Sequence, residues 1–357
     1  MAAKQGHLIS WFRDIGSGDR LTVGGKGAGL GELIRAGIAV PPGFVATTTA
    51  FERFLAAIDG EGSIRATIEA LDPGNLDELV EVSGKLRERI EGSAVSREIQ
   101  DAVVSAYSEL CGEDREAPVA VRSSATSEDS EEASFAGLQE TYLWVCGPEK
   151  VLAAVRQCWS SLYSTESVSY RRRLGLPEDQ LAMGVVVQRM VHPKCSGVMF
   201  TRSPTSGDRS VIIIEASWGL GSSIVSGDVT PDNFVVSKVT NEVTRRSVSE
   251  KSVQHVPDLE AGGVSEEPVP LELRSVSCLE DDEIQALVQI ARRAEDHFGC
   301  PQDIEWAISR EDTAGQGIYL LQSRPETVWA RREEKSIVQP KERAMDHVFS
   351  LLGGGKR

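Results

Sequence analysis

Several features that mark other protein classes are absent from this sequence of 357 residues. No apolar run approaches the ~18 residues that cross a membrane, and the opening MAAKQGHLISWF lacks the apolar core of a signal peptide. The six cysteines form neither a CxxC pair nor a cluster with histidine, which argues against a zinc site. We therefore expect reduced, mostly buried thiols and a cytoplasmic protein.

Positive charge is also scarce, because 38 lysines and arginines stand against 54 acidic residues and leave a net charge of −16. Neither nucleic acid nor an anionic membrane is expected as the main partner of such a chain. A local cluster of basic side chains inside a cleft can still bind an anionic nucleotide. The length suggests two or three packed units.

The periodicity of the sequence changes from helical to extended near Gln188. Amphipathic patterns predict helices within residues 62–110 and 149–173, and a capped helix at Thr48–Ile58. From residue 182 the β-rich runs MGVVVQRMV and SGVMFTR follow, joined by a predicted turn at Pro193-Lys194.

Further along the chain, residues 251–281 are predicted to form an irregular insert, followed by a helix and two last strands. We predict an α+β fold with two lobes, residues 1–188 and 189–330, and a ligand between them. The charged residues 331–357 are expected to form a tail or linker.

The most informative segment is PVAVRSSATSEDSEEASFAGLQETYL, residues 118–143. A short apolar strand is expected to end at Arg122, whose planar guanidinium can bind phosphate oxygens. The small residues that follow let backbone N–H groups approach the same anion. The acidic residues at 128, 129, 131 and 132 fit a solvated loop face or, as the minority alternative, a metal site.

A second segment, VGGKGAGLGEL at residues 23–33, is a glycine-rich turn that leads into a helix. Its backbone N–H groups and the mobile charge of Lys26 can bind an anion. The GxxxxGK[ST] spacing of a P-loop is absent. On spacing alone, a purely structural turn explains the pattern equally well.

The third segment is the predicted pair of strands that contain DIEWA, starting at Asp303, and QSRPET, starting at Gln322. Strand alternation places Asp303 and Glu305 on one face, and Gln322 and Arg324 on one face of the neighbouring strand. Carboxylate and amide oxygens suit Mg²⁺, and an arginine can neutralise charge on a transferred phosphoryl group. From the residues alone, the alternative is a polar ladder on a solvated sheet face.

Together these segments resemble the nucleotide-binding domain shared by phosphoenolpyruvate synthase, pyruvate phosphate dikinase and rifampin phosphotransferase. The family patterns VGGKxAxLGEL, DIEWA and QxRPET are matched almost letter for letter, and the resemblance covers about residues 15–330. It implies an ATP-grasp fold that binds ATP and Mg²⁺ in the cleft between two lobes. The matching segment EASWGLGSSIVSG could close over phosphate, and Asp232 could brace a turn.

The resemblance also implies roles for single residues at the nucleotide. Lys26 and Arg122 would orient the triphosphate, and Gly137 and Thr141 would belong to the loop that covers the phosphates. Gln188 falls at the adenine site of the family. Without the resemblance, a glutamine in an apolar strand equally fits a hydrogen-bonded core position.

The same resemblance makes Glu305 and Gln322 the Mg²⁺ ligands. Arg324 would stabilise the transition state, and Lys26 and Arg122 complete the predicted catalytic set. Mg-ATP would give AMP and phosphate, with the β-phosphoryl group passing to a histidine.

That acceptor histidine is missing, since none of the five histidines lies in the glycine-rich Thr-Ser-His context of the family's swivelling domain. We therefore expect a partner subunit to carry it, in a hetero-oligomer. The start at Met1, the insert and the charged tail favour a stand-alone subunit that resembles the ATP-binding subunit of phenylphosphate synthase or 4-methylbenzyl phosphate synthase. The final acceptor would then be a phenolic compound entering degradation.

Two alternatives remain open. The chain could be the ATP-binding domain of a longer phosphoenolpyruvate synthase or rifampin phosphotransferase. It could also be a non-catalytic module that senses ATP, although a sensor has no need of Glu305, Gln322 and Arg324 together.

Overall fold

The computed structural model describes residues 6–59, 62–114, 116–126, 129–130, 133–134, 140–178, 181–258, 262–311, 317–327 and 329. Contacts divide the chain into one compact unit, Met1–Glu326, and a second unit, Thr327–Arg357. The first unit contains all the elements described below and has the predicted α+β fold, with antiparallel sheets.

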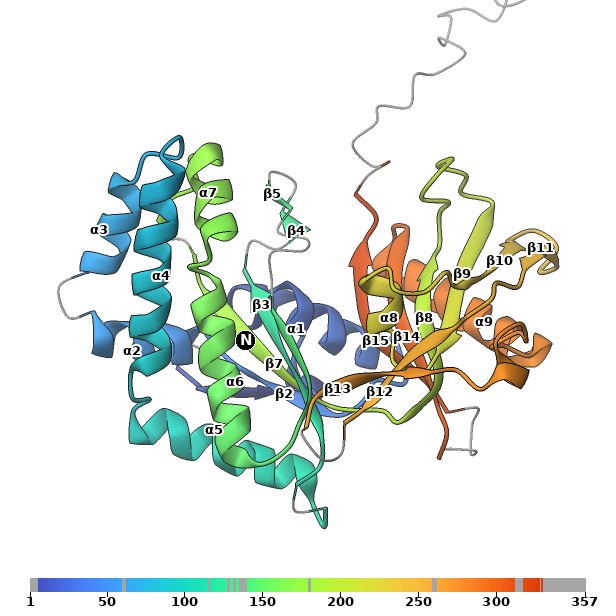
Figure 1. Cartoon of the computed structure of the whole chain (residues 1–357), viewed down its shortest axis with the longest axis horizontal. Coiled ribbons are helices and arrows are strands. Elements are labelled where there is room, and N and C mark those ends of the chain that lie inside the picture. Colours follow the sequence, from blue (N-terminus) through green and yellow to red (C-terminus); the bar gives the residue numbers. More distant parts are fainter. Residues whose placement is uncertain are drawn as a thin grey trace, which may run out of the picture. The chain divides into compact units, whose positions relative to one another are not determined.

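The first sheet has the strand order β1-β2-β7-β3-β6, and all its neighbours are antiparallel. Its strands are β1 (Ile9–Trp11), β2 (Gly43–Ala46), β3 (Val119–Ala125), β6 (Thr141–Val145) and β7 (Met183–Arg189). Six helices gather beside it in Figure 1: α2 (Thr48–Ile58), α3 (Ser63–Ala70), α4 (Leu76–Gly92), α5 (Arg97–Cys111), α6 (Pro148–Ser161) and α7 (Thr165–Leu174).

Strand alternation divides the apolar residues of this sheet between two cores. Phe44, Val121 and Val187 join the helices α2–α7 in one buried cluster. Val45 and Val186 belong to the other cluster, which contains α1 (Arg20–Arg35) and the second sheet. Helix α1 therefore lies in the core shared by the two sheets.

The second sheet has the order β11-β10-β9-β8-β14-β15. Its strands are β8 (Pro193–Phe200), β9 (Val211–Trp218), β10 (Asp232–Ser237), β11 (Val243–Ser247), β14 (Gln302–Ser309) and β15 (Ile318–Pro325). Helix α9 (Asp281–Phe298) packs its buried residues into the core of this sheet. Short elements complete the described chain: β4 (Asp129–Ser130) paired with β5 (Ala133–Ser134), β12 (Val253–Pro257) paired with β13 (Val264–Pro268), and α8 (Ser222–Val225).

Several predictions about local structure are confirmed. The helix at Thr48–Ile58 is present, and the two long helical regions are α3–α5 and α6–α7. All six cysteines are free thiols, and four of them are buried. Among the described residues, no helix is long and apolar enough to cross a membrane.

Three predictions about local structure are wrong. There is no turn at Pro193-Lys194, because both residues belong to β8, and residues 190–192 carry the chain from one sheet to the other. The insert at 251–281 contains the paired strands β12 and β13. Arg122 does not end its strand, since β3 continues to Ala125 through two serines whose hydroxyls bond to backbone carbonyls.

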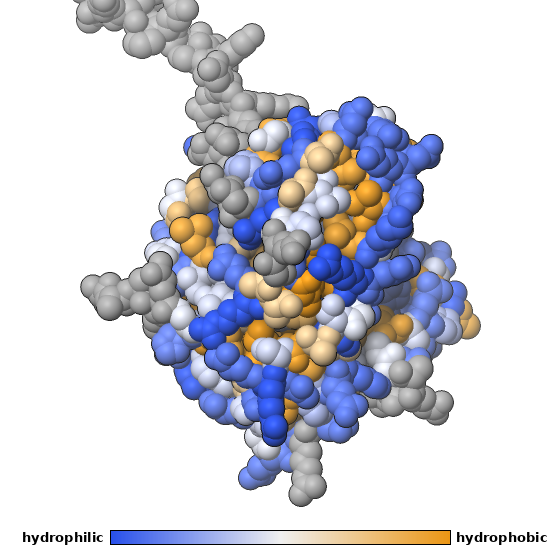
Figure 2. All heavy atoms as spheres, turned by 90° about the vertical axis from the view of Figure 1, so that its left-hand side faces the viewer, coloured by the Kyte–Doolittle hydropathy of each residue, from blue (hydrophilic) through white to orange (hydrophobic). Residues whose placement is uncertain are grey.

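Figure 2 views the molecule from the side of the helices that cover the first sheet. Hydrophilic residues dominate this face, with hydrophobic residues scattered among them. Two exposed apolar side chains, Leu76 and Val80, belong to α4. Exposed apolar residues of this kind are normal on a globular protein.

Candidate nucleotide-binding site

A cavity of about 400 Å³ lies where the two sheets meet. Residues of β3, β6 and β7 line it from the first sheet, and residues of β8, β14 and β15 line it from the second. Residues 220–226, which include α8, complete its wall. Such a volume, with mostly apolar walls and a few convergent polar groups, is typical of a small-molecule site.

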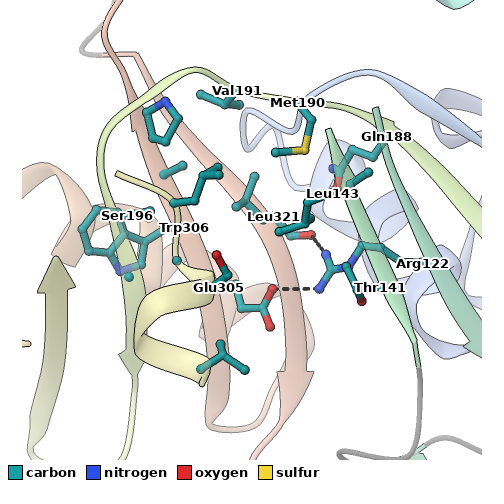
Figure 3. A pocket seen from close by; sticks show the side chains of 18 of the residues that line it. Arg122, Thr141, Leu143, Gln188, Met190, Val191, Ser196, Glu305, Trp306 and Leu321 are labelled. Atoms are coloured by element: carbon teal, nitrogen blue, oxygen red, sulfur yellow. Dashed lines mark hydrogen bonds and ion pairs between the residues drawn. The ribbon is translucent and has the colours of Figure 1, made fainter. Parts of the chain in front are cut away.

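Arg122 forms the charged end of the cavity (Figure 3). Its Nη2 lies 2.8 Å from Glu305 Oε2 and 2.5 Å from Gln322 Oε1, and its Nη1 donates to the Leu321 carbonyl at 3.0 Å. The buried Nε has no hydrogen-bond acceptor among the described residues. Arg122 of the first sheet thus meets the two predicted metal ligands of the second sheet.

The two last strands pair as neighbours, as predicted, and the structure supplies their register. Glu305 lies opposite Gln322, and Asp303 lies opposite Arg324, in the antiparallel pairing of β14 with β15. Because Arg122 Nη2 contacts both Glu305 and Gln322, their side-chain oxygens point to one place. A carboxylate and an amide oxygen in this arrangement fit Mg²⁺, which prefers oxygen ligands and would neutralise phosphate charge there.

The pair Asp303–Arg324 lies next to this one on the same strands. Arg324 Nε is 3.6 Å from Asp303 Oδ2, and 44% of the arginine side chain is exposed. Burial raises the pKa of the Asp303 carboxyl, and the charge of Arg324 opposes that rise. Asp303 Oδ1 is buried without a hydrogen-bond partner in the described chain, so this pair is incompletely hydrogen-bonded.

The glycine-rich turn packs against β3 next to Arg122. Ser124 Oγ donates to the Val23 carbonyl at 2.8 Å and accepts from the Gly27 N–H at 3.2 Å. Gly24 has φ +73°, and a Cβ there would lie 1.9 Å from the Ser124 carbonyl oxygen. These contacts explain the glycine at position 24 structurally, and Lys26 is carried just beyond it on α1.

Gln188 and the residues after it form the more apolar end of the cavity. The side chain of Gln188 is buried, and its Nε2 approaches the Pro41 carbonyl at 3.5 Å. In Figure 3 it lies beside Met190 and Leu143, across the cavity from Trp306. An aromatic base could be sandwiched between such side chains while bonding to backbone groups of residues 188–191.

The other predicted site residues have different positions. Thr141 lines the cavity and is the register partner of Arg122 in β6. Lys26, Gln322 and Arg324 are not among the described residues that line it. Gly137 lies outside the described residues, as do the acidic positions 128, 131 and 132.

Sequence reasoning missed part of the cavity wall. Leu143 and Trp306 are apolar strand residues, Met190 follows the end of β7, and nothing in their type distinguishes them from core. Residues 220–226 carried a weak signal, because glycine and serine were expected there only to cover phosphate. Figure 3 shows their short helix next to the strand that carries Glu305.

Gly197 on β8 also lines the cavity, beneath Trp306. A Cβ at this position would lie 1.8 Å from the Glu215 carbonyl oxygen and 2.7 Å from the indole ring of Trp306. The close packing of the indole on the strand therefore requires glycine. Trp306 is fully buried as a result.

Comparison with known proteins agrees with this geometry. A probable phosphoenolpyruvate synthase of Methanothermobacter thermautotrophicus is 41% identical over 94% of this chain and 48% of its own length. The phosphoenolpyruvate synthase of Aeropyrum pernix is 41% identical over 94% of the chain and 44% of its own length. A rifampicin phosphotransferase of Streptomyces is 39% identical over 90% of the chain and 36% of its own length.

The chain thus spans less than half the length of each of these three relatives. A single family description, "pyruvate phosphate dikinase, AMP/ATP-binding domain", matches residues 20–345. This range includes all the residues that line the cavity. The chain belongs to the family of the AMP/ATP-binding domain of pyruvate phosphate dikinase.

Proposed function

We propose that this chain binds ATP in the cavity and acts as the ATP-dependent phosphotransferase part of a phosphoenolpyruvate-synthase-like system. The observation that carries the proposal is Arg122, which reaches from β3 to Glu305 and Gln322 across the cavity. Three polar groups from separate strands converge there, and two of them, Arg122 and Glu305, line the cavity. The adenine would occupy the end near Gln188.

In this proposal the phosphate oxygens of ATP replace Glu305 as acceptors for Arg122. A guanidinium already turned toward the cavity needs little reorganisation, and its bare Nε offers a further donor. Glu305 and Gln322 are then free to hold Mg²⁺ against the phosphates. Arg324, half-exposed on the same face, neutralises the charge that develops on the phosphoryl group.

The β-phosphoryl group passes to a histidine outside this chain, its bond to the AMP oxygen breaks, and water takes the γ-phosphoryl group. The rings of three histidines make contacts within the chain. His192 contacts Glu311 at 3.2 Å, His255 contacts Ser222 at 2.8 Å, and His297 contacts Glu32 at 2.8 Å. We propose that a partner subunit supplies the acceptor and passes the phosphoryl group to a phenolic compound such as cresol or phenol.

A second candidate is a domain of a longer enzyme that carries its own acceptor histidine. The names of the relatives support it about equally, since they are phosphoenolpyruvate synthases and a rifampicin phosphotransferase of which the chain spans less than half. Pyruvate or an antibiotic would then be the final acceptor. The position of the stop codon in the gene separates these two candidates.

Labelling tests the phosphotransfer itself. The purified chain is given Mg-ATP labelled at the β-phosphate in a lysate of its own organism. We expect AMP to accumulate and acid-labile label to appear on a second polypeptide, whose mass identifies the partner. ATP binding without AMP formation or transfer would favour an ATP sensor or a domain severed from its own histidine, and would contradict transfer to a partner subunit.

A further inference from the structure

The paired strands β12 and β13, here called the strap, connect the two sheets (Figure 1). On one side the Gly263 N–H donates to the Trp144 carbonyl of β6 at 3.4 Å. On the other side, Lys251, just before the strap, forms a fully buried ion pair with Asp232 of β10 at 2.6 Å. The strap is therefore bonded to the first sheet, and the residue just before it to the second sheet.

His255 on β12 holds the segment that contains α8. The Leu220 N–H donates to the His255 carbonyl at 2.9 Å. The imidazole Nδ1 lies 2.8 Å from Ser222 Oγ, and Nε2 lies 3.4 Å from Asp228 Oδ2. Only 15% of this side chain is exposed. Both ring nitrogens and the backbone of one residue therefore contact residues 220–228.

The chemistry of Asp228, His255 and Ser222 determines which atom donates and which accepts in these contacts. A carboxylate is acceptor-only, so Asp228 favours the proton on Nε2. Nδ1 of the neutral ring is then an acceptor, and the Ser222 hydroxyl donates to it. This chain of contacts fixes the rotamer of Ser222 and orients the imidazole ring at the same time.

Helix α8 needs such support because it has only four residues. A single helical turn is not stable by itself in water, so tertiary contacts must place it. Ser222, Val225 and Ser226 of this segment all line the cavity, and Val225 is 74% exposed. An apolar side chain held open to solvent in a cavity wall is suited to be covered by a ligand.

We propose that His255 is a positioning residue, which holds α8 in place as the wall that covers the bound nucleotide. The inference rests on the proposed function only in placing ATP in the cavity. His255 does not touch the nucleotide in this account. It acts through Ser222 and through the backbone of Leu220. The strap that carries it is held between the two sheets by the contacts described above.

Equilibrium binding of a non-hydrolysable ATP analogue tests this role without requiring turnover. For H255A we expect the dissociation constant to rise roughly tenfold, the scale of one lost buried hydrogen bond. H255N should restore most of the affinity, because its amide reaches the position of Nδ1. The matched control is H297A, which removes a half-buried histidine bound to Glu32, and it should bind like the parent chain.

A double-mutant cycle with S222A distinguishes positioning from direct contact. If His255 acts through Ser222, S222A and H255A/S222A weaken binding about as much as H255A does. Additive losses would show that the two residues act separately and would overturn the inference. Unchanged binding by a folded H255A, checked by its unfolding temperature, would overturn it too.

Failure of the proposed function gives a different result. If the parent chain does not bind the analogue, the placement of ATP in the cavity is wrong, and this inference falls with it. If the parent chain binds but H255A, H255N and H297A all bind equally, only the role of His255 is wrong. AMP formation enters neither measurement.

Discussion

The ion pairs buried far from the cavity differ from those at its charged end in how completely they are hydrogen-bonded. Arg171 is fully buried, and its Nε and Nη2 donate to the two oxygens of Glu178 at 3.1 and 3.2 Å. Its Nη1 donates to the Leu162 carbonyl and to Ser167 Oγ. By contrast, Arg122 Nε at the cavity and Asp303 Oδ1 two residues before Glu305 on β14 have no hydrogen-bond partner among the described residues.

This difference separates ion pairs that specify the fold from those that are ready to accept a ligand. A completely bonded buried pair has one low-energy arrangement, because any movement leaves a charge unpaired. An incompletely bonded pair at a cavity already has a buried polar atom without a hydrogen bond. It can therefore exchange one partner for another at a smaller cost in free energy. We therefore expect substitutions in the first group to change stability, and substitutions in the second to change catalysis.

The largest effect is expected for R171M. Removing one partner of a buried pair costs about 3–5 kcal/mol of unfolding free energy, because Glu178 is left charged and buried. Urea denaturation measures this loss. The folded variant should bind ATP as tightly as the parent chain, and a clear loss of affinity would blur the distinction between the two groups of pairs.

R324A should show the opposite behaviour. We expect turnover, measured as AMP formation, to fall by ~10²-fold or more, because a charge that stabilises the transition state is lost. ATP affinity should stay within roughly tenfold, and stability should change by less than about 0.5 kcal/mol, as for other surface substitutions. The control is R97A on α5, whose side chain is 93% exposed. Turnover similar to that of R97A would contradict the role of Arg324.

E305Q addresses the predicted metal pair. The amide keeps the shape of Glu305 and can still accept from Arg122, but it lacks the negative charge that attracts Mg²⁺. We expect the Mg²⁺ concentration for half-maximal AMP formation to rise roughly tenfold, the scale of one charge-assisted interaction. Chelation of Mg²⁺ should abolish AMP formation in both chains. An unchanged Mg²⁺ dependence in E305Q would remove Glu305 from the metal site.

The smallest effect is expected at Asp59, a carboxylate far along the chain from the cavity residues. Burial raises the pKa of Asp59, but hydrogen bonds from the Ser63 hydroxyl and from the N–H groups of Ile64 and Ser63 outweigh it, and the net pKa is lowered. A lowered pKa stabilises the folded state above the unfolded pKa, and this stability is lost as the pH falls through the folded pKa.

For D59N, the loss of unfolding free energy relative to the parent should be largest above about pH 4 and should shrink at lower pH. Denaturation of both chains at several pH values measures this difference in unfolding free energy. A range of roughly pH 2–7 spans the titration of carboxyl groups. A difference between the two chains that does not depend on pH would show that the carboxylate charge does not matter there.

Local features of the site could be predicted from the sequence where they depend on the alternation of side chains along a strand. Alternation and a polar connection were enough to predict two neighbouring strands, with Asp303 and Glu305 on one face and Gln322 and Arg324 on one face. The pairing of Glu305 with Gln322 and of Asp303 with Arg324 came from the structure. The fold class followed from the motifs and from the change of periodicity near Gln188. The roles of these residues in binding and catalysis stay predictions.

The features that were not predicted depend on contacts between residues distant in sequence. Such contacts leave no periodic pattern in the sequence. Ser123 and Ser124 looked like loop residues, yet they continue β3, because they pair with Val185 and Gly184 of β7. Their hydroxyls also bond to the Glu140 and Val23 carbonyls. The polar composition of the strap concealed two strands. Equally, β7 and β8 are consecutive in sequence but pair with different sheets, and that choice depends on the partner strands.

Gly197 has a consequence for how this cavity can evolve. Any coding change at that position adds at least one carbon, which collides with the Glu215 carbonyl and pushes Trp306 out of place. A single substitution of Gly197 therefore cannot reshape the cavity for a different nucleotide without disturbing the packing around it. Changes in the shape of the cavity are therefore expected in the wall that Met190 and Leu143 line, across from Trp306 (Figure 3).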